Sequence, residues 1–406
     1  MITHIEIGGF KSLQEVSLDL GGLNIFVGTN ASGKTNFLDA LRVLQGIGYG
    51  FTIEEIFNGK PKSASSEVWE PIRGGRDNAG FVSWTSAAAT PVQGLVRFAV
   101  RLKSSELEQQ LAYSIAVSMQ EGNIREESLR LGDAPVFSSG GTRGLPPSMI
   151  PVDYTGGEHG PLGFERSRPV LRQVLKSRHC TERDAELIEI CARLLSNTQL
   201  LDPSPTFLRG YSTPSKVRRM GERGENFAGL VRSILSDDSN ATAYTSWLKQ
   251  LTPTELDEVE TLPGALQEPL FAFKRRGHGF PAPVLSDGTL RFAAIAAAFF
   301  QPDMPDTLMI EEIENGIHPT RLRLLVELLR SQAANGGPQV MATSHSPLVL
   351  AWLNEEDHKT TFFCKKDEET GASTITPLSS VPRFKDLVRK QPVADLFAEG
   401  WLEGAL

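Results

Sequence analysis

Short apolar runs and helical spacing alternate near the N-terminus of this 406-residue chain. Apolar, β-branched runs predict strands, and apolar residues that recur every three or four positions after residue 36 predict a helix. The predicted strands cover 4–7, 16–20 and 23–27. From 46 to 80 the chain is rich in Gly, Ser, Pro and charge without a sustained period, which predicts a long surface excursion.

The middle of the chain changes from a period of two to helical spacing. Alternation of apolar and polar residues predicts an antiparallel sheet over 81–85, 94–102, 110–119 and 124–131. A Gly/Pro-rich loop is predicted for 133–163. Helices are predicted over 166–178, 182–196, 222–236 and 239–251, with Thr181 and Asp184 forming an N-terminal cap for the second. A Pro-rich connection then leads to Leu285.

The final third alternates helices and strands. The predicted order is a helix over 289–300, a strand over 307–310, a helix over 321–334, a strand over 339–343, a helix after Pro347 and a strand over 360–364. Such a βαβ rhythm is typical of a mostly parallel sheet with helices on its faces. We therefore predict an α/β fold. Residues 1–45 and 285–406 form one head, 46–135 an antiparallel β subdomain with loops, and 136–284 a mainly α-helical insertion.

Composition narrows the class of protein. The length suits two or three domains, and 40% hydrophobic with 22% charged residues is ordinary for a globular chain. We expect no membrane partner, because the sequence has neither a secretory start nor a run of about 18 apolar residues. Cys180, Cys191 and Cys364 form no CxxC pair, which favours a reduced, cytoplasmic protein.

The net charge of −8 argues against a general nucleic-acid coat, because non-specific binding depends on cationic surface. Two basic clusters could still form a local groove, and a solvated or salt-bridged surface would explain each of them as well. The first cluster is Lys216, Arg218, Arg219 and Arg223, and the second is Lys274, Arg275, Arg276 and His278.

The segment Gly28–Thr35 reads GTNASGKT, a complete GxxxxGK[ST] phosphate-binding loop between a predicted strand and a predicted helix. In this context backbone N–H groups cradle the β- and γ-phosphates of a nucleoside triphosphate, Lys34 adds a positive charge, and the Thr35 hydroxyl reaches Mg²⁺. The predicted nucleotide-binding residues of this segment and of the position after it are Asn30, Ala31, Ser32, Gly33, Lys34, Thr35 and Asn36.

Two carboxylates, Glu311 and Glu312, follow the predicted strand over 307–310. Ligands of open α/β sheets bind at the carboxyl ends of strands. Hydrolysis of a magnesium nucleotide needs one acid near the metal and another that activates the attacking water. Glu311 suits the metal and Glu312 suits the general base, whereas a solvated strand end is the alternative without chemistry.

A second phosphate site is predicted at Leu285–Arg291, LSDGTLR, directly before an apolar helix. Ser286 can cap that helix and Gly288 allows a close backbone approach to an anion. One triphosphate already occupies the first loop, so this site would serve a nucleotide bound to another copy of the chain. Simple capping by Ser286 is the alternative.

Three further residues have two readings each. His345 in Thr343–Pro347 follows a predicted strand, where it could sense the γ-phosphate or merely cap the next helix. His318 could act likewise or be a turn residue before a Pro-started helix. Lys11 could reach the nucleotide or be an ordinary exposed lysine in a turn.

The order of these motifs resembles the ABC-type ATPases of the SMC/RecF/OLD branch, and especially stand-alone bacterial AAA-type ATPases of defence systems. The resemblance covers about half of the chain, at its two ends. It rests on GFKSL (9–13), GTNASGKTN (28–36), LSDGTLR (285–291), MIEEIENGIHP (309–319), TSHSP (343–347) and the closing ADLFAEGW (394–401).

The resemblance implies a P-loop ABC-type head and a head-to-tail homodimer around ATP. Lys34 and Thr35 of one subunit would hold ATP and Mg²⁺, and Ser286 and Gly288 of the other would close over the γ-phosphate. Glu312 would be the general base and His345 the switch. Three residues depart from the family pattern: Asp287 in the signature, Glu311 in place of Asp, and Ile313 in place of Pro.

Two further expectations follow from the resemblance. Gln93 is a candidate for the glutamine that couples Mg²⁺ to the insertion. OLD-type relatives carry a nuclease domain after the ATPase, but about sixty residues follow His345 here. We therefore expect no nuclease in this chain, and any DNA cleavage would come from a partner.

The motifs leave more than one function open. The leading hypothesis is an ATPase that closes as a dimer around ATP and acts on duplex DNA, in anti-phage defence or DNA repair, with a separate nuclease or toxin as effector. The alternative is an ATP-controlled scaffold that holds such an effector without binding DNA. A small-molecule kinase is disfavoured by the paired glutamates with a following His, and a GTPase by the absence of NKxD.

Overall fold

The computed structural model describes residues 1–60, 69–83, 94–154, 162–252, 256–381, 384, 391–398 and 400. The chain forms two compact units, each built from separate stretches of sequence. The first comprises Met1–Gly21, Gly28–Thr198 and Phe362–Leu378, and the second Gly22–Val27, Gln199–Thr361 and Ser379–Leu406. The division into a head, a β subdomain and a helical insertion stays a prediction. Within the described ranges, none of the helices combines the length and apolar character of a membrane-spanning segment.

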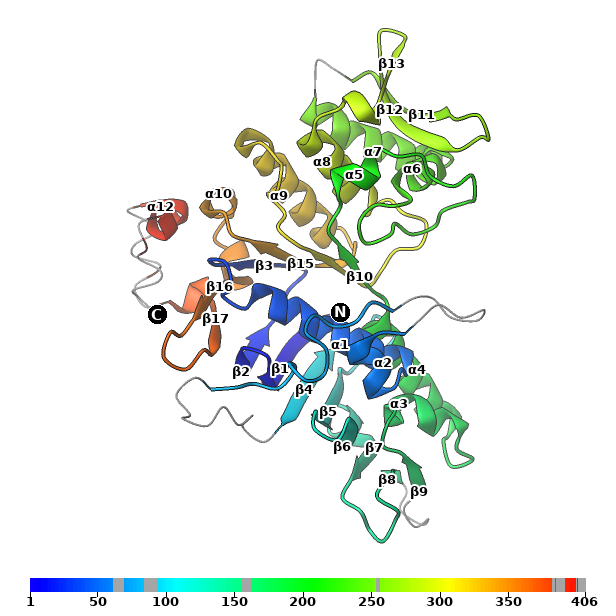
Figure 1. The fold of residues 1–406 in the computed structure, drawn as a ribbon, viewed down its shortest axis with the longest axis vertical. Coiled ribbons are helices and arrows are strands. Elements are labelled where there is room, and N and C mark those ends of the chain that lie inside the picture. The colour runs from blue at the N-terminus through cyan, green and yellow to red at the C-terminus, as the bar shows by residue number, and fades with distance from the viewer. Residues whose placement is uncertain are drawn as a thin grey trace. The chain divides into compact units, whose positions relative to one another are not determined.

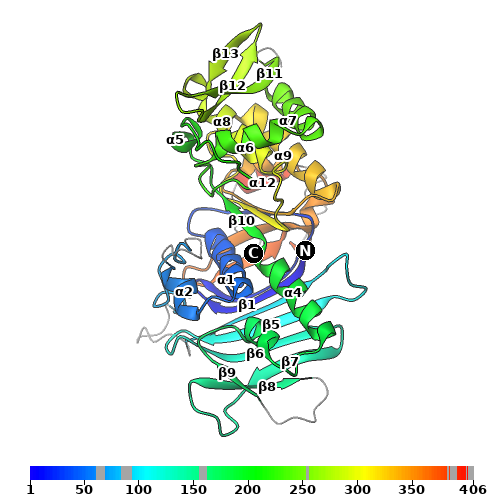
Figure 2. The ribbon, with the colours of Figure 1, turned by 90° about the vertical axis from the view of Figure 1, so that its right-hand side faces the viewer.

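The first unit contains an antiparallel sheet in the order β2-β1-β4-β5-β6-β7-β8-β9 (Figures 1 and 2). Its strands are β1 (Ile2–Phe10), β2 (Leu13–Asp19), β4 (Leu95–Leu102), β5 (Leu111–Ser118), β6 (Asn123–Leu131), β7 (Ala134–Gly140), β8 (Met149–Tyr154) and β9 (Leu162–Glu165). Phe98 is buried while its neighbour Arg97 is exposed, as period two requires. The predicted antiparallel sheet over 94–131 is confirmed.

Two sequence predictions for this sheet were wrong. Residues 133–163 contain β7, β8 and β9 rather than only loop. In β7 the adjacent residues Val136 and Phe137 are both buried, so the alternation that marks a strand is absent there. In the stretch 81–85, residues 81–83 form no strand, and 84 and 85 lie outside the described residues.

Helices lie on one face of this sheet (Figure 2). They are α1 (Lys34–Tyr49), α2 (Ile53–Asn58), α3 (Val170–Gln173) and α4 (Glu182–Ser196). The α4 prediction is confirmed with its cap, since Thr181 Oγ1 accepts the Asp184 N–H at 3.1 Å. The helix predicted over 166–178 shrinks to α3 and one 3-10 turn, Val174–Lys176. The stretch from residue 46, predicted as a surface loop, instead begins with the end of α1. It continues into α2, whose start is fixed by a capping box of Thr52 and Glu55.

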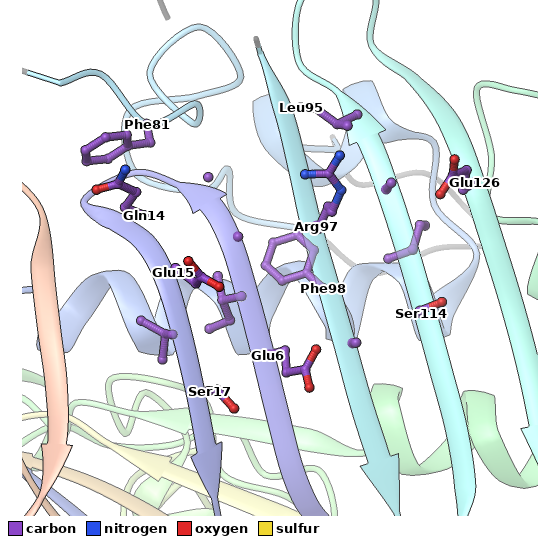
Figure 3. Close-up of a pocket in the computed structure, with 17 residues that line it drawn as sticks. Glu6, Gln14, Glu15, Ser17, Phe81, Leu95, Arg97, Phe98, Ser114 and Glu126 are labelled. Atoms are coloured by element: carbon purple, nitrogen blue, oxygen red, sulfur yellow. The ribbon is translucent and has the colours of Figure 1, made fainter. Parts of the chain in front are cut away.

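The exposed positions of the strands line the other face of the sheet. A groove of about 690 Å³ lies there, with Glu6 of β1, Arg97 of β4 and Ser114 of β5 among its lining residues (Figure 3). None of the residues predicted to act on a nucleotide lines it. The hairpin of β16 (Thr361–Lys366) and β17 (Ser373–Pro377) completes this unit, with β17 against β2.

The second unit contains the parallel strands. These are β3 (Leu23–Val27), β14 (Thr307–Ile310) and β15 (Gln339–Ser344), and the sheet order is β10-β14-β15-β3 with β10 at Thr198–Leu201. β14 pairs with β15 and β15 with β3, both in parallel. All five residues of β3 and all four of β14 are buried, as expected for a sheet covered on both faces. The predicted βαβ arrangement is confirmed.

Helices and a small sheet make up the rest of this unit. The helices are α5 (Pro205–Leu208), α6 (Phe227–Leu235), α7 (Asp238–Leu251), α8 (Asp287–Ala297), α9 (Pro319–Ala334), α10 (Pro347–Leu350) and α12 (Val393–Ala398). The predicted Pro-rich connection is instead an antiparallel sheet of β11 (Glu258–Pro263), β12 (Pro269–Arg275) and β13 (His278–Pro281). Its prolines lie at strand ends, where a missing N–H interrupts the ladder least.

A buried carboxyl group, Glu127, joins β6 to α3 in the first unit. Its side chain accepts hydrogen bonds from the Tyr113 hydroxyl at 2.9 Å and from the N–H groups of Val170 and Leu171 at 2.6 and 2.8 Å. Burial raises the pKa of Glu127 to about 7, although these hydrogen bonds act in the opposite direction. The folded chain therefore keeps a proton that the unfolded chain loses near pH 4.5.

We predict that Glu127→Gln changes the pH dependence of stability. Between pH 4.5 and 7 the folded wild type binds more protons than the unfolded chain, so its stability falls as pH rises. The loss is on the order of 3 kcal/mol over that range. Urea unfolding of both proteins at about pH 4 and about pH 8, on either side of this range, measures it. The variant should lack this component, and identical pH dependence of the two proteins would contradict the assignment.

Candidate functional site

The phosphate-binding loop wraps around its own lysine in the first unit. Lys34 begins α1 and is 8% exposed. Its Nζ donates to the carbonyl oxygens of Gly28 at 2.7 Å and Thr29 at 2.8 Å. Gly33, directly before the helix, has a φ of +103°, which favours glycine. The loop is thus a closed turn around the Lys34 ammonium group. This group can replace its two backbone carbonyl partners by phosphate oxygens.

Two positions of the phosphate-binding loop require glycine, because neighbouring atoms leave no room for a Cβ. At Gly28 a Cβ would lie 2.2 Å from the backbone oxygen of Cys364. At Gly33 it would lie 2.4 Å from Ser373 Oγ. Both neighbours belong to the β16–β17 hairpin, so the hairpin fixes the loop from one side. The glycines therefore fit a nucleotide cradle for a reason that the motif alone does not give.

The turn between β1 and β2 holds the first turns of α1. Ser12 Oγ accepts from Asn36 Nδ2 at 2.7 Å and lies 2.7 Å from Ser373 Oγ. Lys11 Nζ donates to Asp39 Oδ2 at 2.5 Å, and that carboxylate is 2% exposed. Burial lowers the pKa of Lys11, while Asp39 opposes this effect. Lys11 is therefore not the exposed turn lysine considered from sequence; it anchors the helix.

The parallel register of the second unit aligns the remaining motifs. Val27 pairs with Ser344, and Ile310 pairs with Ala342. The chain continues from these strand ends into Gly28, into His345 and into Glu311 and Glu312, respectively. Three predicted functional segments thus begin at one edge of one sheet, as the carboxyl-end rule requires.

The backbone of the two predicted acids is fixed by Arg291, which is 4% exposed. Its Nη2 donates to the carbonyl oxygens of Glu311 at 2.9 Å and Glu312 at 3.2 Å. Glu312 has a φ of +46°, and its N–H donates to Thr343 Oγ1 at 3.0 Å. A left-handed backbone is strained for a residue other than glycine, and the hydrogen bonds from Arg291 and to Thr343 keep Glu312 in this conformation. The Glu312 side chain is left exposed.

His345 contacts a third glutamate, Glu314. The His345 N–H donates to Glu314 Oε1 at 2.8 Å, and Nδ1 lies 3.0 Å from the same oxygen. The Glu314 side chain is 9% exposed, whereas that of His345 is 46% exposed. His345 is thus held at its backbone and at one ring nitrogen. Ser346, rather than His345, caps α10.

The segment Leu285–Arg291, called the signature segment below, contains the N-cap and the start of α8 in the second unit. Ser286 caps the helix, because its Oγ accepts the Thr289 N–H at 3.3 Å, as the capping reading predicted. A Cβ at Gly288 would lie 2.3 Å from the Gly316 oxygen, so this glycine permits close packing on the turn after Glu314. A hollow of about 640 Å³ lies beside it, lined by Ser286, Asp287, Gly288, Gly316, His318, Thr320 and Arg321.

The remaining candidates from the sequence are His318, the two basic clusters and Gln93. His318 is the N-cap of α9, which matches its turn reading. In the basic clusters Lys274 pairs with Glu258 at 3.0 Å, and Arg219 Nε lies 3.9 Å from Asp303 Oδ2. Arg218, Arg223 and Arg276 are exposed. Gln93 lies outside the described residues.

Sequence reasoning missed three residues that shape this site: Glu314, Arg291 and Asp39. A signal existed for Glu314, since a third acid follows a buried Ile313 in the same segment. Arg291 lies at the end of the quoted signature segment, but its contacts with Glu311 and Glu312 join residues about twenty positions apart. Asp39 carried no signal, because a helix-face acid is normally solvated.

Two stretches of the chain match known protein families. Residues 193–351 match the domain family described as "AAA domain, putative AbiEii toxin, Type IV TA system", and residues 1–60 match the "AAA ATPase domain" family. The chain is 22% identical over 391 residues to an ATP/GTP phosphatase of Helicobacter pylori (strain ATCC 700392 / 26695), covering 91% of this chain and 93% of that protein.

Two further curated proteins are similar over smaller shares of their length. The OLD nuclease of Thermus scotoductus (strain ATCC 700910 / SA-01) is 21% identical over 375 residues, which cover 86% of this chain and 59% of that protein. The DNA replication and repair protein RecF of Nitrosococcus oceani (strain ATCC 19707 / BCRC 17464 / JCM 30415 / NCIMB 11848 / C-107) is 40% identical over 58 residues. That stretch covers 14% of this chain and 16% of RecF.

Solved structures share the fold. A crystal structure of an SMC head bound to the C-terminal winged-helix domain of ScpA gives a TM-score of 0.54 at 14% identity, covering 92% of this chain and 96% of that one. An SMC head domain with an extended coiled coil, bound to the C-terminal domain of ScpA derived from Pyrococcus furiosus, gives 0.52 at 12% identity, covering 96% and 99%.

The loop around Lys34 and the matched ATPase domains define a nucleotide-binding ATPase with a mixed α/β fold. More narrowly, the matched domains and relatives make the chain similar to the ABC-type ATPases of the SMC/RecF/OLD group.

We predict that Gly28→Ala destabilises the first unit, because the new methyl group would meet the rigid backbone of Cys364. The expected loss is roughly 1–3 kcal/mol in free energy of unfolding, measured by urea denaturation. Gly80→Ala is the matched control, since nothing lies within 4 Å of its Cβ position. It should stay within about 0.5 kcal/mol of the wild type. An equal effect of both changes would refute the packing argument.

Proposed function

We propose that this ATPase is a molecular switch that dimerises around ATP and releases its partner on hydrolysis. The observation that carries this is the parallel register of β3, β15 and β14, because the chain continues from their carboxyl ends into a phosphate loop, a histidine and two acids, respectively. The resemblance to SMC/RecF/OLD ATPases supports the same arrangement. Its free thiols, Cys180, Cys191 and Cys364, fit a reducing cytoplasm.

Each predicted site residue has one role in this proposal. Lys34 and the backbone of Asn30–Asn36 bind the phosphates, and Lys34 leaves the carbonyls that it contacts in the present structure. Thr35 and Glu311 offer the oxygen donors that Mg²⁺ accepts, and the ion would neutralise charge on the phosphates. Glu312 takes the proton of the attacking water. His345 contacts the γ-phosphate and registers its loss.

The second copy of the chain supplies Ser286 and Gly288. This part of the proposal is supported by the hollow beside the α8 N-terminus, where Ser286 and Arg321 are among the lining residues. A helix N-terminus favours an anion through its exposed N–H groups and its dipole. The γ-phosphate of a nucleotide bound to another copy is the anion that we propose for it.

We predict that Glu312→Gln retains ATP binding but lowers hydrolysis by roughly 10²–10⁴-fold, because the water loses its general base. Dimers should then persist in ATP, as measured by light scattering after gel filtration together with phosphate release. Adding Ser286→Arg should return the chain to monomers without loss of ATP affinity. Lys34→Ala is the control that loses nucleotide itself. Turnover by strictly monomeric protein would contradict the shared site.

We further propose that the closed dimer acts on duplex DNA, in anti-phage defence or DNA repair, together with a separate effector. The names of two similar proteins, OLD nuclease and RecF, support a link to DNA. The description matched by residues 193–351 names a toxin system, which supports an effector. The alternative is a scaffold that holds the effector without touching DNA, and the net charge of −8 favours it.

A filter-binding titration against salt separates these two functions. If the chain binds duplex DNA, affinity should require ATP and fall steeply with salt, since each contacted phosphate releases counterions. Lys216→Ala combined with Arg223→Ala should then lower the log–log slope by about two. Arg183→Ala, which removes an exposed charge of α4 in the other unit, is the matched control. ATP-dependent dimers without DNA binding at low salt would favour the scaffold.

A further inference from the structure

Glu314 is one of three glutamates that follow β14, and its side chain is largely enclosed. Its side chain is 9% exposed, and Oε1 accepts from the His345 N–H at 2.8 Å and faces Nδ1 at 3.0 Å. We infer that Glu314 is the positioning residue that fixes the ring of His345 for phosphate sensing. The inference rests on the proposed role of His345 and deepens it.

The contact fixes which ring nitrogen faces the reaction. An ionised carboxylate can only accept a hydrogen bond, so the proton between Glu314 and the ring belongs to Nδ1. Nε2 is then the nitrogen left for reacting groups. As a neutral ring it accepts from water at Nε2, and as imidazolium it donates from Nε2 to a phosphate oxygen. Without the carboxylate, both tautomers and ring orientations become accessible.

The second carboxylate oxygen gives independent support. Glu314 Oε2 is buried and has no hydrogen-bond partner within the described part of the chain. A buried carboxylate oxygen without a protein donor costs stability, because desolvation of the charge is not repaid by a hydrogen bond from the chain. A side chain kept only for packing or for capping a turn would not need a carboxylate here. The cost indicates that the charge itself serves His345.

The surrounding backbone makes the pair a rigid unit. The Glu312 N–H donates to Thr343 Oγ1 at 3.0 Å, and the Ile313 N–H donates to the backbone carbonyl oxygen of Thr343 at 3.0 Å. Two residues beyond Glu312 the direction is reversed, and the His345 N–H donates to the side chain of Glu314. The turn after β14 is therefore fastened to the end of β15 at two successive points. The proposed base, Glu312, and the proposed switch, His345, are therefore held in fixed positions relative to each other, and the Glu314 side chain makes the contact with His345.

The decisive variant is Glu314→Gln, which keeps the shape and one acceptor oxygen but removes the charge. We expect kcat for ATP hydrolysis to fall roughly tenfold or more, with the KM for ATP within about twofold, because binding by the loop is untouched. Glu327→Gln on α9, where the carboxylate is exposed and pairs with Arg323, is the matched control and should match the wild type. Unchanged kcat in the Glu314→Gln protein would overturn the inference.

A double-mutant cycle tests whether Glu314 acts through His345. In a His345→Ala background, Glu314→Gln should lower kcat by less than about twofold further, since the ring that it orients is gone. Fully additive losses would mean that Glu314 acts elsewhere, and they would refute its positioning role. A merely structural residue would also produce additive losses.

A spectroscopic measurement remains decisive if the Glu314 variants fail to fold. Nitrogen-15 NMR of histidine-labelled full-length wild type, assigned with His345→Ala, reports which ring nitrogen carries the proton. The neutral ring should be protonated at Nδ1, and protonation at Nε2 would overturn the inference. If the wild type hydrolyses no ATP, the proposed function fails while this spectrum still tests the contact. If Glu312→Gln blocks hydrolysis but Glu314→Gln does not, only the inference fails.

Discussion

The hydrogen-bonded register of β3, β15 and β14 is the constraint on which the site depends. Because Val27 lies opposite Ser344 and Ile310 opposite Ala342, segments separated by up to about three hundred positions leave the sheet at the same edge. A shift of one residue would turn every side chain of a strand to the other face. Buried strands resist such a shift, and this gives the following loops fixed starting points.

The turn after β14 connects the parts of the second unit. Arg291 of α8 holds the backbone of Glu311 and Glu312, Thr343 of β15 binds the Glu312 N–H, and Gly288 packs against Gly316. A change at the signature helix would thus reach the proposed base without passing through a nucleotide. Such a link between two sites is what a switch needs, since energetic coupling requires elements with shared contacts.

In the first unit, packing and hydrogen bonds from two neighbouring turns fix the shape of the phosphate loop. The β16–β17 hairpin excludes a Cβ at Gly28 and Gly33, and the β1–β2 turn fastens α1 through Ser12 and Lys11. The Lys11–Asp39 pair is largely removed from water, so losing one partner would leave the other as a buried, uncompensated charge. The two turns therefore keep the loop in shape before a ligand arrives.

Local signals in the sequence determined much of this protein. The strand, loop and helix around Lys34, the acids after β14, the cap at Ser286 and the alternation of β4 to β6 are each written within about ten residues, and each fixes a backbone conformation or a face. The prolines of β11 to β13 and the short strands β7 to β9 were misread, because pairing at sheet ends overrode local propensity.

Only the tertiary structure decided the partners of these groups. Contacts between distant segments place Glu314 against His345 and bond Arg291 to the carbonyl oxygens of Glu311 and Glu312. Such contacts also make glycine necessary at positions 28 and 33, beside Cys364 and Ser373. A sequence specifies which side chains can donate, accept or carry charge. Which of them meet depends on the register of strands and the close packing of turns, because a hydrogen bond or a steric clash is decided within a few tenths of an ångström.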